Sequence, residues 1–117
     1  MALIKHGRNV GVFTPERPIE KHFHDHDETW VILEGAARAH LVDREGAHHE
    51  FHLEPGDVWM IEVGCEHEAT PTTPEFRLTY VPGTIPPGAH PPGHYYLEQE
   101  WYIPSLQLVK TPTTRYG

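Results

Sequence analysis

The chain has 117 residues, enough for one folded domain but too few for a second with a core of its own. Its formal charge of −8, with only nine Lys and Arg, excludes the clustered basic surface that nucleic-acid binding requires. The sequence contains neither the apolar run of a membrane helix nor an apolar signal-peptide stretch near its start, so we expect a cytoplasmic protein without a membrane partner.

Histidine is the residue that stands out in the composition, with 11 copies in the chain. An excess of histidine indicates metal or proton chemistry, because imidazole is both a metal ligand and a group that titrates near neutral pH. The single cysteine, Cys65, excludes an internal disulfide and is expected to be a small packed residue.

Five segments in the middle of the chain have the β-branched, aromatic or alternating pattern of strands, and glycine or proline turns separate them. These predicted strands are residues 30–34, 37–43, 48–53, 57–61 and 75–81. No segment has the 3.6-residue period of a helix with capping residues. Short strands at this spacing predict an all-β sandwich or barrel.

The last third of the chain has a different composition. Residues 83–93 are rich in proline and glycine, and no regular element is expected there. Residues 95–109 are aromatic and apolar, so we expect this tail to pack across a homodimer or to cover the mouth of the barrel.

The segment from His22 to Glu28 places three histidines and three carboxylates within seven residues. In an extended chain, His22 and His24 project to the same side, because side chains alternate with period two. Two imidazoles on one face, joined by a carboxylate, form a good site for a borderline metal ion. A helix would also pair His22 with His26, but Pro18 upstream and the β-branched run after Thr29 disfavour it.

The pattern His22-x-His24-x3-Glu28-x6-Gly35 resembles the first motif of the cupin superfamily, in which the two histidines and the glutamate are metal ligands. A register beginning at His24 leaves no carboxylate at the required spacing. By this resemblance His26 is an exposed loop residue rather than a fifth ligand.

Downstream, Gly56, Gly64 and His67 resemble the second cupin motif, whose histidine completes the metal site. The chain departs from the two motifs at three turn positions. Glu16 stands where the first motif has glycine, and the second motif has Glu62 in place of proline and Pro71 in place of asparagine.

The resemblance implies a single-domain cupin over residues 1–117, an antiparallel double-stranded β-helix or jelly-roll barrel spanning about residues 8–82. It implies one divalent transition metal on His22, His24, Glu28 and His67. Three nitrogens and one carboxylate suit iron, manganese, nickel, cobalt, zinc or copper, and leave open coordination positions for a small-molecule substrate.

Strand alternation extends the predicted site into a pocket. If Glu28 faces the interior, Trp30 and Ile32 share its face, and Trp59 and Tyr80 are further pocket candidates, although core packing is an alternative for the aromatic residues. On the strand 37–43, either the face of Arg38 and His40 or that of Ala37, Ala39 and Leu41 lines the cavity.

Three classes of function are compatible with such a site. The first is a metal-dependent enzyme, of dioxygenase type or an isomerase, epimerase or lyase, acting on a small oxygen-rich or chelating substrate. Glu62, His40 and Arg38 are its candidate catalytic residues, provided that they reach the pocket. The second is a non-catalytic ligand-binding or sensor domain, and the third is a storage-type or structural cupin. His48, His49 and His52 are expected on the surface.

Overall fold

A computed structural model of the chain describes residues 10–83 and three short pieces, 94–95, 101–103 and 108–110. The regular elements in these residues are all strands, as the sequence predicts. They are β1 (Val10–Phe13), β2 (Ile19–His24), β3 (Glu28–Glu34), β4 (Ala37–Val42), β5 (His48–Leu53), β6 (Val58–Ile61), β7 (Glu66–Pro71), β8 (Phe76–Pro82), β9 (His94–Tyr95), β10 (Trp101–Ile103) and β11 (Leu108–Lys110). In this part of the chain, no helix is long and apolar enough to cross a membrane.

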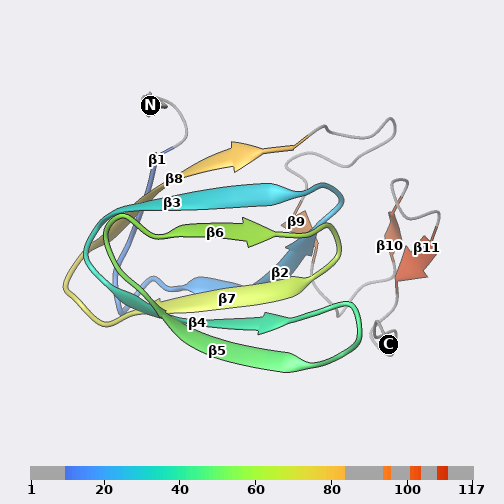
Figure 1. The fold of residues 1–117 in the computed structure, drawn as a ribbon, viewed down its shortest axis with the longest axis horizontal. Helices are drawn as coiled ribbons and strands as arrows, with labels where there is room; N and C mark the ends of the chain where they lie inside the picture. The colour runs from blue at the N-terminus through green and yellow to red at the C-terminus, as the bar shows by residue number, and fades with distance from the viewer. Residues whose placement is uncertain (1–9, 84–93, 96–100, 104–107, 111–117) are drawn as a thin grey trace.

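The strands form two antiparallel sheets, ordered β1-β8-β3-β6 and β5-β4-β7-β2-β9, and β10 pairs separately with β11. Figure 1 shows the chain crossing repeatedly from one sheet to the other, for example from β2 to β3 and from β6 to β7. Such double-sheet crossing is the jelly-roll arrangement. The predicted fold class is therefore confirmed.

The core lies between the two sheets and follows the period-two pattern of the strands. On β3, Trp30 and Ile32 are buried beside Glu28, as strand alternation predicts. On β4, Ala37 and Ala39 are fully buried. This answers the question that the sequence left open, because the alanine face of β4 is the inner one.

Three strands of the barrel, β1, β2 and β7, are absent from the five strands that the sequence predicts, although an extended conformation was considered for the segment from His22. β1 is a four-residue edge strand, and β7 lies in the middle of its sheet. The β7 segment contains glutamates and ends in Pro71, so its composition is not typical of a strand. Its only strand signal is the alternation of the buried His67, Ala69 and Pro71 with the more exposed Glu68 and Thr70.

The C-terminal region is described only in pieces. β9 adds to the edge of β2, where Tyr95 pairs with Phe23 and His94 with His24. Residues 84–93, for which no regular element was expected, lie outside the described residues. The predicted packing of the tail on a dimer partner or over the barrel mouth falls largely outside them as well.

Gly35, in the turn between β3 and β4, occupies a crowded site with a left-handed backbone. Its φ is 77°, and a Cβ atom there would overlap the carbonyl oxygen of Glu75. The turn is fastened to the loop before β8, because Ala36 N donates to Thr73 Oγ1 at 3.0 Å and Thr72 N to Ala36 O at 2.9 Å. A glycine is therefore required both by conformation and by space.

The first prediction concerns this turn. Gly35→Ala should lower the free energy of unfolding by at least twice as much as Gly56→Ala, measured by denaturant titration. Gly56 has a φ of 93° and open space around it, so its substitution introduces only backbone strain, about 1–2 kcal/mol. Equal losses in the two variants would show that the contact with Glu75 does not matter.

Candidate metal centre

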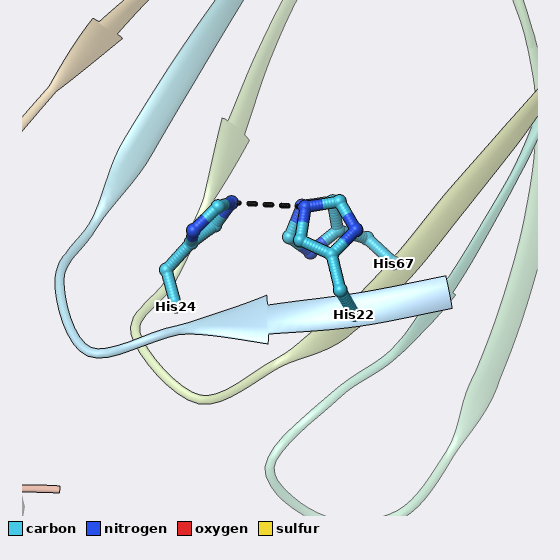
Figure 2. Close-up of side chains that lie close together, drawn as sticks. All are labelled: His22, His24 and His67. Atoms are coloured by element: carbon cyan, nitrogen blue, oxygen red, sulfur yellow. Dashed lines mark hydrogen bonds between the residues drawn. The ribbon is translucent and has the colours of Figure 1, made fainter. Parts of the chain in front are cut away.

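Three histidines from two strands meet on the inner side of the barrel. His22 and His24 are on β2, and His67 on the antiparallel β7 is the direct register partner of His22. A register shift between Ile19 and His22 marks a bulge, the kind of irregularity that re-aims side chains in a strand. Figure 2 shows the three imidazoles pointing toward one another.

The distance between His22 and His24 matches that between neighbouring ligands of one ion, and His67 is close to both. His22 Nε2 lies 3.2 Å from His24 Nε2, and each of the three histidines offers a ring nitrogen within 4.8 Å of the others. Neighbouring ligands at about 2.1 Å from a metal lie about 3.0–3.4 Å apart in octahedral or tetrahedral geometry.

Backbone carbonyls orient two of the three rings. His22 Nδ1 donates to Glu20 O at 2.6 Å, and His67 Nδ1 donates to Cys65 O at 3.0 Å. A carbonyl can only accept, so the proton of each neutral ring is on Nδ1 and the lone pair is on Nε2. This is the arrangement by which proteins fix the ligating nitrogen of a histidine.

His67 provides the clearest indication that an ion belongs at this position. Its side chain is fully buried, and its Nε2 has no hydrogen-bond partner among the described residues. A buried lone pair without a donor costs free energy unless another group satisfies it. Burial, followed by the nearby rings of His22 and His24, holds the pKa of His67 well below its usual value and keeps Nε2 available.

Glu28, at the first position of β3, supplies a carboxylate next to these rings. Trp30 Nε1 donates to Glu28 Oε1 at 2.7 Å, and His24 Nε2 lies 3.2 Å from the same oxygen. Burial by itself would raise the pKa of Glu28, but the hydrogen bonds and charges of His24, together with the bond from Trp30, lower it to about 2. The residue is therefore a carboxylate at neutral pH.

The potential donor atoms fall into two overlapping groups rather than one. His22, His24 and His67 form the first, and His24, His26 and Glu28 form the second, each within 4.8 Å. The four residues predicted as ligands are thus neighbours, with His24 as the shared member. A divalent transition metal fits these donors, and their role in binding it stays a prediction.

His26 differs from its expected position. The sequence placed it in an exposed loop, whereas it is only 6% exposed and bonded through Nδ1 to Asp25 Oδ1 at 2.7 Å. The turn between β2 and β3 folds inward, so both residues are covered. Sequence alternation could have suggested this, because His22, His24 and His26 are spaced by two.

A pocket of about 350 Å³ leads to the cluster. His22, Glu28, Trp30 and Tyr80 line it, with Glu20 and the mainly apolar side chains of β1, β2 and β8 completing the wall. These further residues are Gly11, Phe13, Pro18, Ile19 and Leu78.

The predicted pocket residues therefore divide into two pairs. Trp30 and Tyr80 line the pocket, whereas Ile32 and Trp59 belong to the hydrophobic core and are not among its lining residues. Trp59 packs edge-on against both Trp30 and Phe51, with ring centroids 4.9 Å apart in each case.

None of the three candidate catalytic residues lines this pocket. Arg38 is exposed, and His40 lies on the same outer face of β4, where it contacts Glu68 Oε2 at 3.2 Å and His48 Nδ1 at 2.9 Å. The Glu62 side chain is 70% exposed and pairs with Arg44 at 3.7 Å. Their catalytic roles were conditional on reaching the pocket, and their positions do not meet that condition.

Three further histidines of the described residues and the cysteine lie where the sequence placed them. His48, His49 and His52 are exposed on β5. Cys65 is a buried free thiol in the hydrophobic core.

Comparisons with known proteins support the fold. No protein-family model matches the sequence, and no curated protein matches it. Among solved structures, tomato vicilin matches 65% of this chain with a TM-score of 0.59 and 14% identity. A variant of oxalate decarboxylase from B. subtilis matches 68% with a TM-score of 0.53 and 26% identity. Hydroxypropylphosphonic acid epoxidase from S. wedmorenis matches 63% of this chain with a TM-score of 0.53 and 22% identity.

These matches cover 22%, 21% and 41% of the vicilin, decarboxylase and epoxidase chains respectively. This chain thus spans about a fifth of the first two and less than half of the third. These neighbours and the two-sheet architecture show that the chain has the jelly-roll fold of cupin proteins, with a cluster of histidines on its inner side.

The second prediction tests the ligands. Protein purified without a tag should contain close to one equivalent of a transition metal by elemental analysis, and His67→Ala should lower that content at least tenfold. His52→Ala, which removes an exposed histidine on β5, is the matched control and should retain the metal. The same metal content in all three proteins would exclude His67 as a ligand.

The third prediction concerns the pH dependence of the metal-free protein. The pKa of His67 is lowered in the folded state, so the unfolded chain binds the extra proton and stability should fall below about pH 6.5. Glu28, with a pKa lowered from 4.5 to about 2, should add a further loss below pH 4.5.

Denaturant midpoints across this range, measured with a chelator, check the third prediction. Each group contributes at most about 1.4 kcal/mol per pH unit. His67→Asn should flatten the slope between pH 6.5 and 4.5. An unchanged slope in that variant would contradict the assignment to His67.

Proposed function

We propose that this cupin is a metal-dependent enzyme of dioxygenase type, acting on a small chelating substrate. The observation that carries the proposal is the buried Nε2 of His67, without a hydrogen-bond partner in the described part of the chain, next to His22 and His24. A divalent transition metal at these nitrogens supplies a Lewis acid and, if it is redox-active, the electron chemistry that dioxygen requires.

The position of the pocket supports a catalytic rather than a structural site. His22 and Glu28 belong both to the donor cluster and to the pocket wall, so a molecule in the pocket reaches the donors directly. A closed structural site leaves no such access. Trp30 holds the Glu28 carboxylate by its Nε1–H at 2.7 Å and fixes its orientation toward His24.

The chemistry of the pocket wall indicates the kind of substrate. Phe13, Pro18, Ile19, Leu78 and the aromatic Trp30 present apolar surface, and no lysine or arginine is among the described lining residues. A polyhydroxylated sugar buried there would leave many of its hydroxyl groups without partners. A molecule with an apolar body and one chelating pair of oxygens matches the wall better.

This argument favours the oxygenase over a sugar isomerase or epimerase. Among the structural neighbours, the epoxidase from S. wedmorenis and the oxalate decarboxylase from B. subtilis are enzymes by their names. Their likeness supports the fold, and the reaction proposed for this chain rests on the site. A lyase and a non-catalytic sensor are the remaining alternatives.

We also propose that the chain forms a homodimer in the cytoplasm. Support for the dimer comes from the outer face of the sheet that contains β1, β3, β6 and β8 (Figure 1). Val12, Val58, Met60 and Val81 are exposed there, with Met60 at 77%. A second copy would remove this apolar surface from water.

The fourth prediction tests the reaction class. The protein is first loaded with Fe²⁺ under anaerobic conditions. On exposure to dioxygen, it should then consume dioxygen in the presence of at least one of a panel of apolar chelating substrates, such as diketones, catechols and 2-oxo acids. His67→Ala should reduce the rate at least a hundredfold, whereas His52→Ala should leave it unchanged. Incorporation of ¹⁸O from labelled dioxygen into the product identifies an oxygenase.

Other outcomes distinguish the alternatives. Turnover of sugars without oxygen consumption would contradict the dioxygenase and favour an isomerase. Saturable binding of a panel member without turnover, in protein that holds its metal, would favour the sensor domain.

A further inference from the structure

A second set of donors lies next to the three histidines of the metal centre. His24, His26 and Glu28 each offer a ligating atom within 4.8 Å of the other two, and all three side chains are buried. His24 and Glu28 are already part of the proposed centre. His26 is the additional member, and the proposed function gives it no role.

The ring of His26 is oriented by a carboxylate, as the rings of metal-binding histidines often are. Asp25 Oδ1 lies 2.7 Å from His26 Nδ1, and the Asp25 side chain is fully buried. This contact occupies Nδ1 and leaves Nε2 as the ring nitrogen that does not contact Asp25. A carboxylate behind the distal nitrogen is the arrangement that orients histidines at metal sites and raises their basicity.

The turn that carries His26 is fastened to the neighbouring loops. Asp27 Oδ1 accepts from Val63 N at 2.8 Å, and Asp27 O accepts from Gly83 N at 2.6 Å. Immediately before the turn, His24 O accepts from Gly64 N at 2.9 Å. These bonds fix the backbone on both sides of His26, so its position does not depend on an unsupported loop.

We propose that His26 is a metal ligand and that the centre contains two overlapping coordination positions. The first consists of His22, His24 and His67, and the second of His24, His26 and Glu28. Because His24 belongs to both, one ion occupies one position at a time and the total stays at one equivalent. The inference rests on the proposed metal binding and adds a fifth protein donor to it.

The two positions differ in their donors, which sets their relative affinity. The first has three imidazoles, whereas the second has two imidazoles and a carboxylate. Borderline ions such as Co²⁺ favour the nitrogen-rich set, so the second position should bind more weakly. Metal binding at the second position becomes measurable when His67 is removed, because His67 belongs only to the first position.

The test is a Co²⁺ titration followed by visible absorbance, with the full chain and the metal alone. His67→Ala should bind one equivalent of Co²⁺ with weakened affinity. Adding His26→Ala to that variant should raise the dissociation constant at least fivefold further, because only two donors of the second position remain. The matched control adds His52→Ala instead, which removes an exposed histidine on β5 and should leave the constant unchanged.

A smaller change than fivefold, or a change equal to that of the His52 control, would overturn the inference. So would a His67→Ala protein that is folded and binds no Co²⁺. Absence of Co²⁺ binding by the unsubstituted protein would instead refute the proposed metal centre as a whole. The two failures are therefore distinguishable.

A second measurement avoids removing the buried His26. In His67→Ala protein labelled with ¹⁵N at histidine, Zn²⁺ should shift the Nε2 resonance of His26 by coordination, while Nδ1 keeps its proton to Asp25. The His52 nitrogens serve as the internal reference and should stay in place. An unmoved His26 Nε2 resonance at saturating Zn²⁺ would contradict the proposal even if the double variant fails to fold.

Discussion

The candidate metal centre depends on the antiparallel pairing of β2 with β7, which sets His22 opposite His67. The two residues are far apart in the sequence, and only this register brings their rings to a centroid distance of 4.2 Å. The donors therefore do not exist as a group in the unfolded chain. An ion bound to them would stabilise the folded barrel by the free energy of its binding.

The pairing of β2 with β7 also explains why the rings of His22 and His67 are oriented as well as brought close together. Glu20 O and Cys65 O, each two residues before the histidine that it holds, accept the Nδ1 protons of His22 and His67. The strand backbone thus supplies the orienting acceptors, and no extra side chain is needed for these two rings. Glu28 and His26 depend on side chains instead, namely Trp30 and Asp25.

Period-two alternation predicted the parts of the site that lie on regular strands. It placed Trp30 and Ile32 on the face of Glu28, whereas His67 was indicated by the resemblance to the second cupin motif. Alternation could not decide which face of β4 is internal, because Arg38 and Ala39 both fit an alternating strand and only the packing of one sheet against the other decides.

The spacing of His22, His24 and His26 by two is the only sequence signal for the buried position of His26, and it does not show that the turn folds inward. The inward fold arises from bonds between the β2–β3 turn and residues such as Val63 and Gly83, which are distant in the sequence. The strand β7 was missed for a related reason. Its polar residues are accommodated because the strand is paired on both sides, and neighbouring strands are not visible in local composition.

The contact between Trp30 and the metal centre has an optical consequence. The indole ring lies 5.6 Å from the ring of His67 and donates to Glu28. An excited indole at this separation loses its energy readily to a transition ion with visible absorption. The intrinsic tryptophan fluorescence of the barrel should therefore decrease when such an ion binds, so that metal binding can be followed without an added dye.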